Sequence, residues 1–113
     1  MSALPIDILD ELRKDYLNSI PGIIVEIKAA LEDGDWEVIE KHFHRFAGSG
    51  QTYGLPDITT VGRGVETYLQ KNPDEPSPIL LAEAISIFEK IVENYRAGTG
   101  DEALTKKILK KIS

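Results

Sequence analysis

Hydrophobic residues recur at intervals of three and four along most of the chain, which is the spacing of one buried helix face. No segment sustains the strict alternation of a half-buried strand. The pattern predicts helices over residues 6–20, 23–31, 36–54, 56–69, 79–96 and 101–113. Helices joined by short loops, each with one apolar stripe, are typical of an antiparallel bundle. We therefore expect an all-α fold: an antiparallel four-helix bundle with a kinked N-terminal helix and a short C-terminal helix.

Each predicted helix contributes one apolar stripe to the expected core. The stripes comprise Ile8, Leu12, Tyr16 and Ile20; Ile24, Ile27 and Leu31; Ile39, Phe43, Phe46, Gly50 and Tyr53; Ile58, Val61, Val65 and Leu69; Leu81, Ile85, Phe88, Val92 and Tyr95; and Leu104, Ile108 and Ile112. The last helix carries its lysines opposite its stripe. A solvated face is the simplest reading of those lysines, and contact with a membrane or a partner is the alternative.

Glycine and proline residues mark the predicted boundaries. Pro21 and the glycine after it are expected to interrupt the first helix. Gly34 suits a helix C-terminus, and Asp35 suits the N-cap of the next helix. Pro56 fits the first turn of the helix that follows. The segment "KNPDEPSP", residues 71–78, holds three prolines and is predicted to be a loop.

Composition narrows the functional classes. A length of 113 residues suits one domain over 1–113, and the absence of cysteine excludes a disulfide framework and thiolate zinc ligands. With two histidines, a closed structural metal site is not expected. A net charge of −6 argues against nucleic-acid binding. We find no signal-peptide pattern and no membrane-length apolar run, and we expect a cytoplasmic monomer that binds no membrane.

One stretch departs from ordinary helix composition. "KHFHRFAGSGQTYG", residues 41–54, keeps helical spacing in its first half but then places Gly48 and Gly50 inside the expected helix, and each costs roughly 1 kcal/mol relative to alanine there. His44 follows the core position Phe43, so it lies at the edge of the buried seam. Ala47 and Gly48 share its face and are small. We expect an imidazole in a shallow clearing that another protein can approach, with His42 as a partly exposed structural residue.

The hairpin formed by the predicted helices 36–54 and 56–69 supplies a partner for this imidazole. Its turn is centred near Leu55, and His44 and Glu66 are each eleven residues away from it. In an antiparallel pair these two positions lie at about the same height. We expect Glu66 to accept the Nδ1–H bond of His44, which fixes the tautomer and leaves Nε2 free as a nucleophile. Gly62 and Gly64 are predicted to be packing glycines on the same helix.

These residues carry a family resemblance. "HRFAGSGQTYG" and the later "VGRGVE" resemble the histidine-phosphotransfer (HPt) domains of two-component phosphorelays, over roughly Leu12 to Leu69. The resemblance implies that His44 accepts a phosphoryl group, that Gly48 permits close docking and that Gly54 closes its helix against the neighbour. It also implies that Glu66 orients the imidazole.

The sequence departs from that family at one position. Ala47 stands where the family usually has a lysine thought to hold the phosphoryl group. Arg45 and Lys41 are the nearby cations expected to substitute, and Lys41, Ala47 and Gly48 are expected to lie at the partner-docking face. Gln51, two turns further along, is a neutral donor that could serve the same end.

Three functions follow from this reading. The first is a phosphoryl carrier without kinase activity, which moves the group between receiver-domain aspartates and has receiver domains and a hybrid histidine kinase as candidate partners. The chain itself needs no cofactor, since Mg²⁺ is expected on the receiver. The second is an interaction module that docks a receiver without phosphate turnover, which the lysine-to-alanine departure favours. The third and least favoured is a hydrolase with a His44–Glu66 dyad, for which we identify no nucleophile or oxyanion site.

Overall fold

The described residues of the protein form five α-helices. The computed structural model describes the backbone of residues 6–98 and 102–112 and the side chains of residues 8–98 and 107–112. The helices are α1 (Ile6–Asp33), α2 (Trp36–Thr52), α3 (Pro56–Lys71), α4 (Pro78–Arg96) and α5 (Glu102–Ile112). The described residues contain no strand. The predicted all-α class is confirmed.

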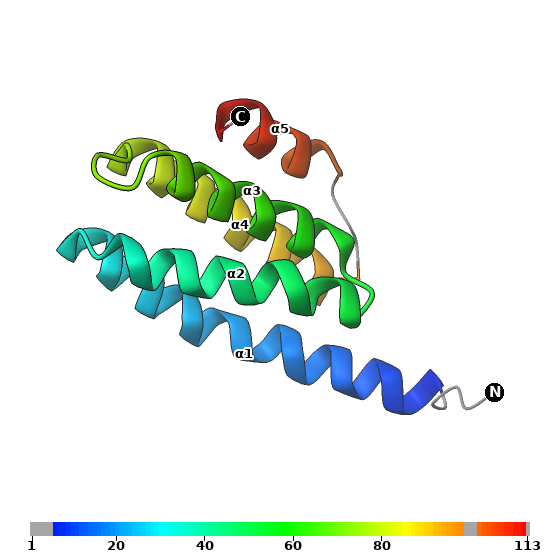
Figure 1. Cartoon of the computed structure of the whole chain (residues 1–113). Helices are drawn as coiled ribbons and strands as arrows, with labels where there is room; N and C mark the ends of the chain where they lie inside the picture. The colour runs from blue at the N-terminus through cyan, green and yellow to red at the C-terminus, as the bar shows by residue number, and fades with distance from the viewer. Residues whose placement is uncertain (1–5, 99–101, 113) are drawn as a thin grey trace.

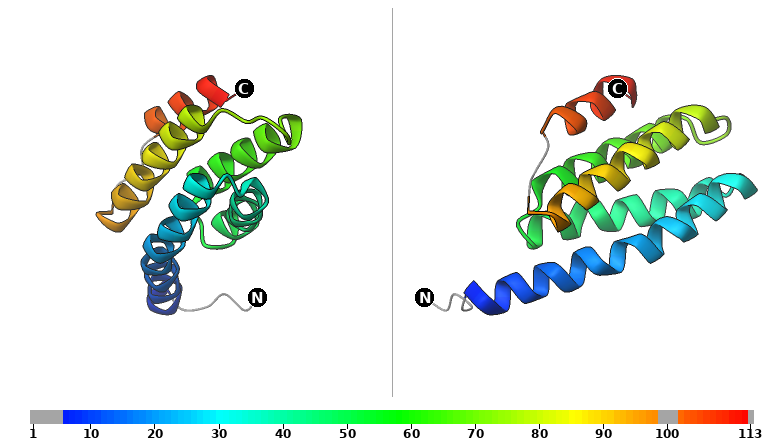
Figure 2. Two further views of the ribbon diagram at one scale, coloured as in Figure 1. Left: turned by 90° about the vertical axis from the view of Figure 1, so that its left-hand side faces the viewer. Right: turned by 180° about the vertical axis from the view of Figure 1, so that it is seen from behind.

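The first four helices form the predicted bundle. Consecutive helices of these four run in opposite directions (Figure 1). Helix α2 lies between α1 and α3, and α1 also packs on α4. The short helix α5 lies across α3 and α4 on the side away from α1, as the two views of Figure 2 show. The short connections at residues 34–35 and 53–55 favour antiparallel packing of each helix on the next one in the chain.

Aromatic residues fill the middle of the core. Phe43 lies edge-on to Phe46 and to Phe88, with ring centroids 5.7 and 5.2 Å apart, and the centroids of Phe46 and Phe88 are 4.8 Å apart. Phe43 and Phe88 are fully buried. These contacts tie α2 to α4 across the bundle and involve the apolar stripes predicted on these two helices.

The first helix does not break at Pro21. It runs without interruption through Pro21 and Gly22, so the predicted division into two separate segments, 6–20 and 23–31, is wrong. A proline inside a helix costs about 3 kcal/mol. Ile20 and Ile24, on either side, are 0% and 4% exposed. Their burial against the bundle stabilises the helical path, and both breakers face solvent.

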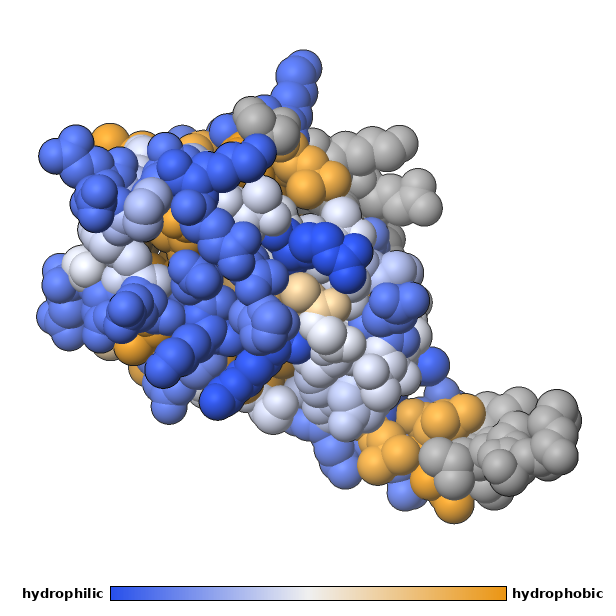
Figure 3. Space-filling view, viewed as in Figure 1, coloured by the Kyte–Doolittle hydropathy of each residue, from blue (hydrophilic) through white to orange (hydrophobic). Residues whose placement is uncertain are grey.

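The N-terminal turns of α1 extend beyond the other helices (Figure 1). A helix of 28 residues spans about 42 Å, whereas α2 and α3 have 17 and 16 residues. Ile8 and Leu12 were expected in the core but are 44% and 41% exposed, because no other helix reaches them. Together with Leu9 they form an apolar patch at the projecting end (Figure 3).

The helix ends follow the predicted breakers closely. Gly34 and Gly54 have φ angles of +69° and +73°, which a residue with a side chain adopts only with strain. Asp35 occupies the predicted N-cap position of α2, but its side chain forms no capping hydrogen bond. Ser77 caps α4, where its hydroxyl accepts a hydrogen bond from the amide of Leu80 at 3.2 Å.

The C-terminal helix covers the outer edge of α3. Ile108 and Ile112 are buried as predicted, whereas the side chain of Leu104 lies outside the described residues. A Cβ atom on Gly64 would come within 3.0 Å of Leu109 and 3.1 Å of Ile112, so Gly64 permits this helix to pack closely. The predicted packing role of Gly64 is therefore confirmed.

Candidate functional site: a helix-borne histidine paired with a glutamate

The α2–α3 hairpin brings His44 and Glu66 into contact. Leu55, at the centre of the turn, is 2% exposed and immediately precedes α3, so the two helices are anchored where they meet. His44 Nδ1 forms a hydrogen bond with Glu66 Oε2. Because a carboxylate can only accept, the ring must carry its proton on Nδ1. The contact expected from equal heights in the hairpin is present.

Close packing of the two helices sets this contact. A Cβ atom on Gly62 would lie 2.6 Å from the Ala47 nitrogen and 2.7 Å from the Phe43 carbonyl oxygen. The equivalent atom on Gly50 would lie 2.7 Å from the backbone nitrogen of Thr59. The neighbouring atoms are backbone and cannot move aside. Glycine at both positions therefore allows the approach that brings the His44 ring within reach of Glu66.

The two partners differ sharply in exposure. The side chain of His44 is 72% exposed and that of Glu66 is 17% exposed. The carboxylate is held in the seam between the helices, while the ring stands above it. Since Nδ1 is occupied by Glu66, Nε2 is the nitrogen left to face solvent. A neutral imidazole in this state carries an unprotonated, accessible nucleophilic nitrogen.

An open surface hollow of about 440 Å³ surrounds the ring. Besides His44 and Glu66, it is lined by Glu40, Lys41 and Arg45. The structure thus brings both cations predicted from the sequence to the same hollow as the histidine. Glu40 was not selected from the sequence, although its position one turn before His44 on the same helix was a usable signal.

Gly48 and Ala47 differ in their surroundings, contrary to expectation. A Cβ atom on Gly48 would meet nothing within 4 Å, so this position is open to an approaching molecule. Ala47 is 8% exposed and its backbone nitrogen faces Gly62, so the expectation that it lies in the open clearing is wrong. Position 47 points toward α3, because the tightest approach of the two helices occurs there. The clearing is therefore formed by Gly48 alone of the pair.

Gln51 lies apart from the hollow. It is exposed and near the end of α2, two turns beyond His44, and it does not line the hollow that contains the ring. A two-turn separation is about 10 Å along the helix axis. The structure does not bring Gln51 together with His44, Lys41 and Arg45.

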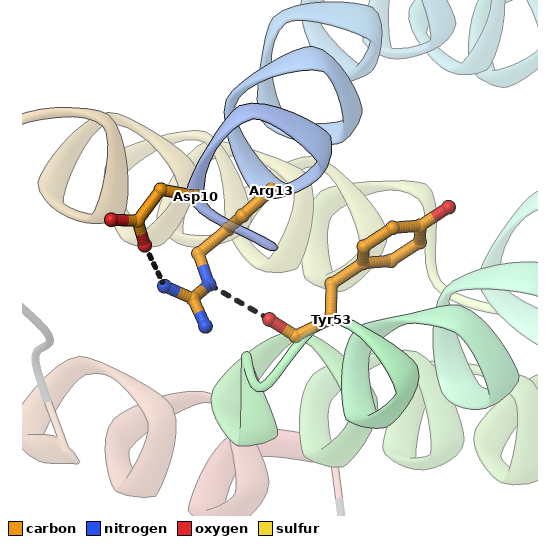
Figure 4. A network of polar contacts seen from close by, with 3 residues as sticks. All are labelled: Asp10, Arg13 and Tyr53. Atoms are coloured by element: carbon orange, nitrogen blue, oxygen red, sulfur yellow. Dashed lines mark hydrogen bonds and ion pairs between the residues drawn. The ribbon is translucent and has the colours of Figure 1, made fainter. Parts of the chain in front are cut away.

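The N-terminal half of α1 fastens the end of α2 that follows His44. Arg13 Nε donates a hydrogen bond to the Tyr53 carbonyl oxygen at 2.8 Å, and its guanidinium also contacts Asp10 at 3.2 Å (Figure 4). The Tyr16 and Tyr53 rings stack with centroids 4.4 Å apart. The Tyr16 hydroxyl is 2.6 Å from Ser49 Oγ. Sequence periodicity placed Tyr16 and Tyr53 on apolar stripes and gave no sign of these polar ties.

Two tyrosines that tie helices together have altered acidity. Burial raises the pKa of Tyr16, which a hydrogen bond to Ser49 partly offsets. Burial also raises the pKa of Tyr95 to about 12. Its hydroxyl accepts from the Asp57 amide at 3.2 Å and donates to the Asp57 carboxylate at 3.0 Å, which links α4 to the first turn of α3. These ties fix the hairpin that carries the site.

The other histidine of α2 points elsewhere. His42 Nε2 lies 3.2 Å from Glu26 Oε2 on α1, and its side chain is 14% exposed. Its predicted structural role fits this position between α1 and α2. Within the described parts of the chain, no group of three His, Cys, Asp or Glu residues could hold a metal ion.

An exposed histidine on one helix of a four-helix bundle, hydrogen-bonded to a glutamate of the next helix, is the arrangement that the resemblance to HPt domains implied. Residues 11–98 match the family model of the Hpt domain. The chain belongs to the Hpt domain family, whose members serve histidine phosphotransfer in phosphorelays. Comparisons with curated proteins and with solved structures gave no match. Among the described residues, no helix combines the length and the apolar character required to cross a bilayer.

Proposed function

We propose that the protein is a phosphoryl carrier whose His44 Nε2 accepts the phosphoryl group of a receiver-domain aspartate and passes it to another receiver. The observation that carries this proposal is the Nδ1 contact with sheltered Glu66, beside a ring that is 72% exposed. Residues 1–113 would act as one domain, with receivers and a hybrid histidine kinase as partners.

The proposed transfer is an in-line displacement. The Nε2 lone pair forms a bond to phosphorus while the bond from phosphorus to the aspartate oxygen breaks, and that electron pair returns to the aspartate carboxylate. The ring gains positive charge as the new bond forms, and the Glu66 carboxylate, holding the Nδ1–H, stabilises that charge. Phosphoryl transfer also needs neutralisation at the phosphoryl oxygens, to which Mg²⁺ on the receiver contributes. The reverse displacement returns the group to an aspartate.

The docking face proposed for the receiver is centred on Gly48. An approaching loop can reach Nε2 most closely where α2 has no side chain, and Gly48 has open space in front of it. Lys41 and Arg45 add positive charge at the same face, which would attract the acidic site of a receiver. Gln51 would contribute a neutral donor at the far end of this face, whereas Ala47 lies in the α2–α3 seam and takes no part in it.

Transfer from a phosphorylated receiver tests the proposal. The protein should gain one acid-labile, base-stable phosphoryl group, and His44→Gln should abolish the gain while leaving the helical circular dichroism spectrum unchanged. An acid-stable phosphate, or labelling that survives His44→Gln, would contradict the proposal.

A docking module without phosphate turnover is the second candidate. The observation that favours it is Ala47, which leaves the site without the family's usual lysine. Receiver binding with an ordinary dissociation constant but no phosphoryl gain by His44 would support this candidate over the carrier.

A further inference from the structure

The charged residues around His44 are separated by sign. Successive helical residues are about 100° apart, so Glu40 lies about 40° from His44 on the side that faces α3, as buried Ala47 does. Lys41 lies about 60° and Arg45 about 100° from His44 on the opposite side, toward α1. The hollow thus has carboxylates on the α3 side and cations on the α1 side.

The orientation of the ring matches this separation. Nδ1 points to Glu66 on α3. Nε2, across the ring from Nδ1, therefore faces away from Glu66, and Lys41 and Arg45 lie on the side of His44 that is away from α3. Helical side chains lean toward the N-terminus, so the His44 ring leans over the preceding turn, which contains Lys41. Neither Lys41 nor Arg45 forms an ion pair with any residue in the described segments.

A phosphoryl group on Nε2 requires such cations. It would add a charge of about −1.5 to −2 to a hollow that already contains two carboxylates. Without compensation, repulsion from Glu40 and Glu66 would favour loss of the group. Ala47 supplies no charge, and its position points into the α2–α3 seam.

We propose that Lys41 is the residue that holds the phosphoryl group on Nε2, with Arg45 in a lesser part, and that Lys41 thereby sets the lifetime of phospho-His44. This inference deepens the proposed carrier function, since it rests on phosphorylation of His44. Lys41 takes precedence because it lies closer to His44 around the helix and on the turn over which the ring leans. Its ammonium stabilises the charge of the bound phosphoryl group, which is lower in the loose transition state through which the group leaves. Removing the ammonium therefore accelerates hydrolysis.

A receiver-free measurement tests this assignment. Phosphoramidate transfers its phosphoryl group to imidazole nitrogen and releases ammonia, so it labels His44 without a docking partner. The decay of phospho-His44 is then followed by intact-mass spectrometry after removal of the reagent. The variants are Lys41→Gln, Arg45→Gln and Lys41→Arg. Lys71→Gln removes the same charge from the far end of α3, outside the hollow, and serves as the control.

We expect Lys41→Gln to shorten the lifetime about three- to five-fold at low salt, as for an exposed charge pair. Arg45→Gln should shorten it less than two-fold, while Lys41→Arg and Lys71→Gln should match the parent protein. Raising the ionic strength should shorten the lifetime of the parent protein toward that of Lys41→Gln.

Several outcomes would overturn the assignment to Lys41. They are equal lifetimes for Lys41→Gln and Lys71→Gln, a larger effect of Arg45→Gln than of Lys41→Gln, and failure of phosphoramidate to label His44. Because no receiver is present, an altered lifetime cannot come from weaker docking. Conversely, if receivers fail to transfer while the lifetimes follow the expected order, the carrier proposal fails and the charge assignment stands.

Discussion

Helix α2 carries two histidines, each paired with a glutamate of a neighbouring helix, and the more exposed partner is the histidine in one pair and the glutamate in the other. In the pair of His44 and Glu66, the ring is 72% exposed and the carboxylate 17%. In the pair of His42 and Glu26, the ring is 14% exposed and the carboxylate 66%. The first pair also engages Nδ1 of its histidine, whereas the second engages Nε2.

The difference shows what makes a histidine available for chemistry in this fold. A sheltered carboxylate has few alternative positions, so it can hold an exposed ring in one orientation at small entropic cost. An exposed carboxylate has many alternative positions, so it does not hold a sheltered ring in one orientation. His42 has its Nε2 turned toward α1, while His44 has its Nδ1 on Glu66 and its Nε2 free. The same two residue types therefore serve packing in one pair and, we propose, phosphoryl transfer in the other.

Replacing each histidine with glutamine should give the largest contrast between the pairs. We expect His44→Gln to abolish phosphorylation by a phosphorylated receiver, because His44 supplies the imidazole of this hollow and His42 faces α1. We expect His42→Gln to keep the rate within about two-fold, since its bond to an exposed carboxylate contributes little. Phosphate incorporation is measured with equal receiver concentrations. A loss in His42→Gln as large as that in His44→Gln would remove the distinction.

Gly62→Ala should break the first pair without touching either member. The added methyl group meets backbone atoms at 2.6 and 2.7 Å, so α2 and α3 must separate. Overpacking costs about 1–3 kcal/mol and replacing a helical glycine returns up to about 1 kcal/mol, so we expect a net loss of about 1–2 kcal/mol. Urea unfolding measures this loss. The contact between His42 and Glu26 should persist, because it joins α2 to α1 and does not depend on the distance between α2 and α3.

Gly48→Ala is the matched control for Gly62→Ala. The new methyl group meets no atom within 4 Å, so we expect a gain of up to about 1 kcal/mol in unfolding free energy. A loss at position 48, or an unchanged stability in Gly62→Ala, would show that the two glycines were assigned the wrong roles.

Glu66→Gln and Glu26→Gln compare the two carboxylates directly. Glutamine keeps an acceptor oxygen at position 66 but removes the charge that stabilises the ring as it is phosphorylated. Misorientation of a reacting group can cost up to about a hundred-fold, and we expect a loss of about ten-fold in transfer rate for Glu66→Gln. Glu26→Gln should leave the rate unchanged. Stopped-flow transfer from a phosphorylated receiver checks both, and equal rates for the two variants would refute the orienting role of Glu66.

Gly48→Gln should have the smallest effect on the chemistry of the ring. A long side chain would cover the face that His44 uses, while the His44–Glu66 contact stays intact. We expect weaker receiver binding and a transfer rate a few-fold lower, with no loss of stability. Isothermal titration with a receiver separates binding from transfer. Unchanged binding and transfer would mean that receivers approach from another side.

The bundle and the contact between His44 and Glu66 could be predicted from the sequence because both follow from local features of the chain. Helix boundaries came from Gly34, Gly54 and Pro56, which act through their own backbone conformations and need no tertiary context. The contact between His44 and Glu66 followed from counting residues on either side of one short turn. Such counting works here because the helices adjoining that turn are regular.

The errors have a common physical origin in packing between distant segments. Pro21 has the local chemistry of a breaker, and only burial of the isoleucines beside it keeps the helix continuous. Ile8 and Leu12 fit an apolar stripe, but whether another helix covers them depends on relative helix lengths. Ala47 was placed in the clearing because periodicity does not reveal how closely α3 approaches at Gly62.

The protonation state of the His44 ring tests the central claim most directly. Long-range ¹H–¹⁵N correlation spectra of protein labelled at histidine nitrogens distinguish Nδ1–H from Nε2–H in a neutral ring. We expect His44 to carry its proton on Nδ1 in the parent protein and to lose this preference in Glu66→Ala, while the His42 signals stay unchanged. A His44 ring protonated on Nε2, or a His44 spectrum identical in Glu66→Ala, would show that Glu66 does not orient the ring, and the account would be wrong.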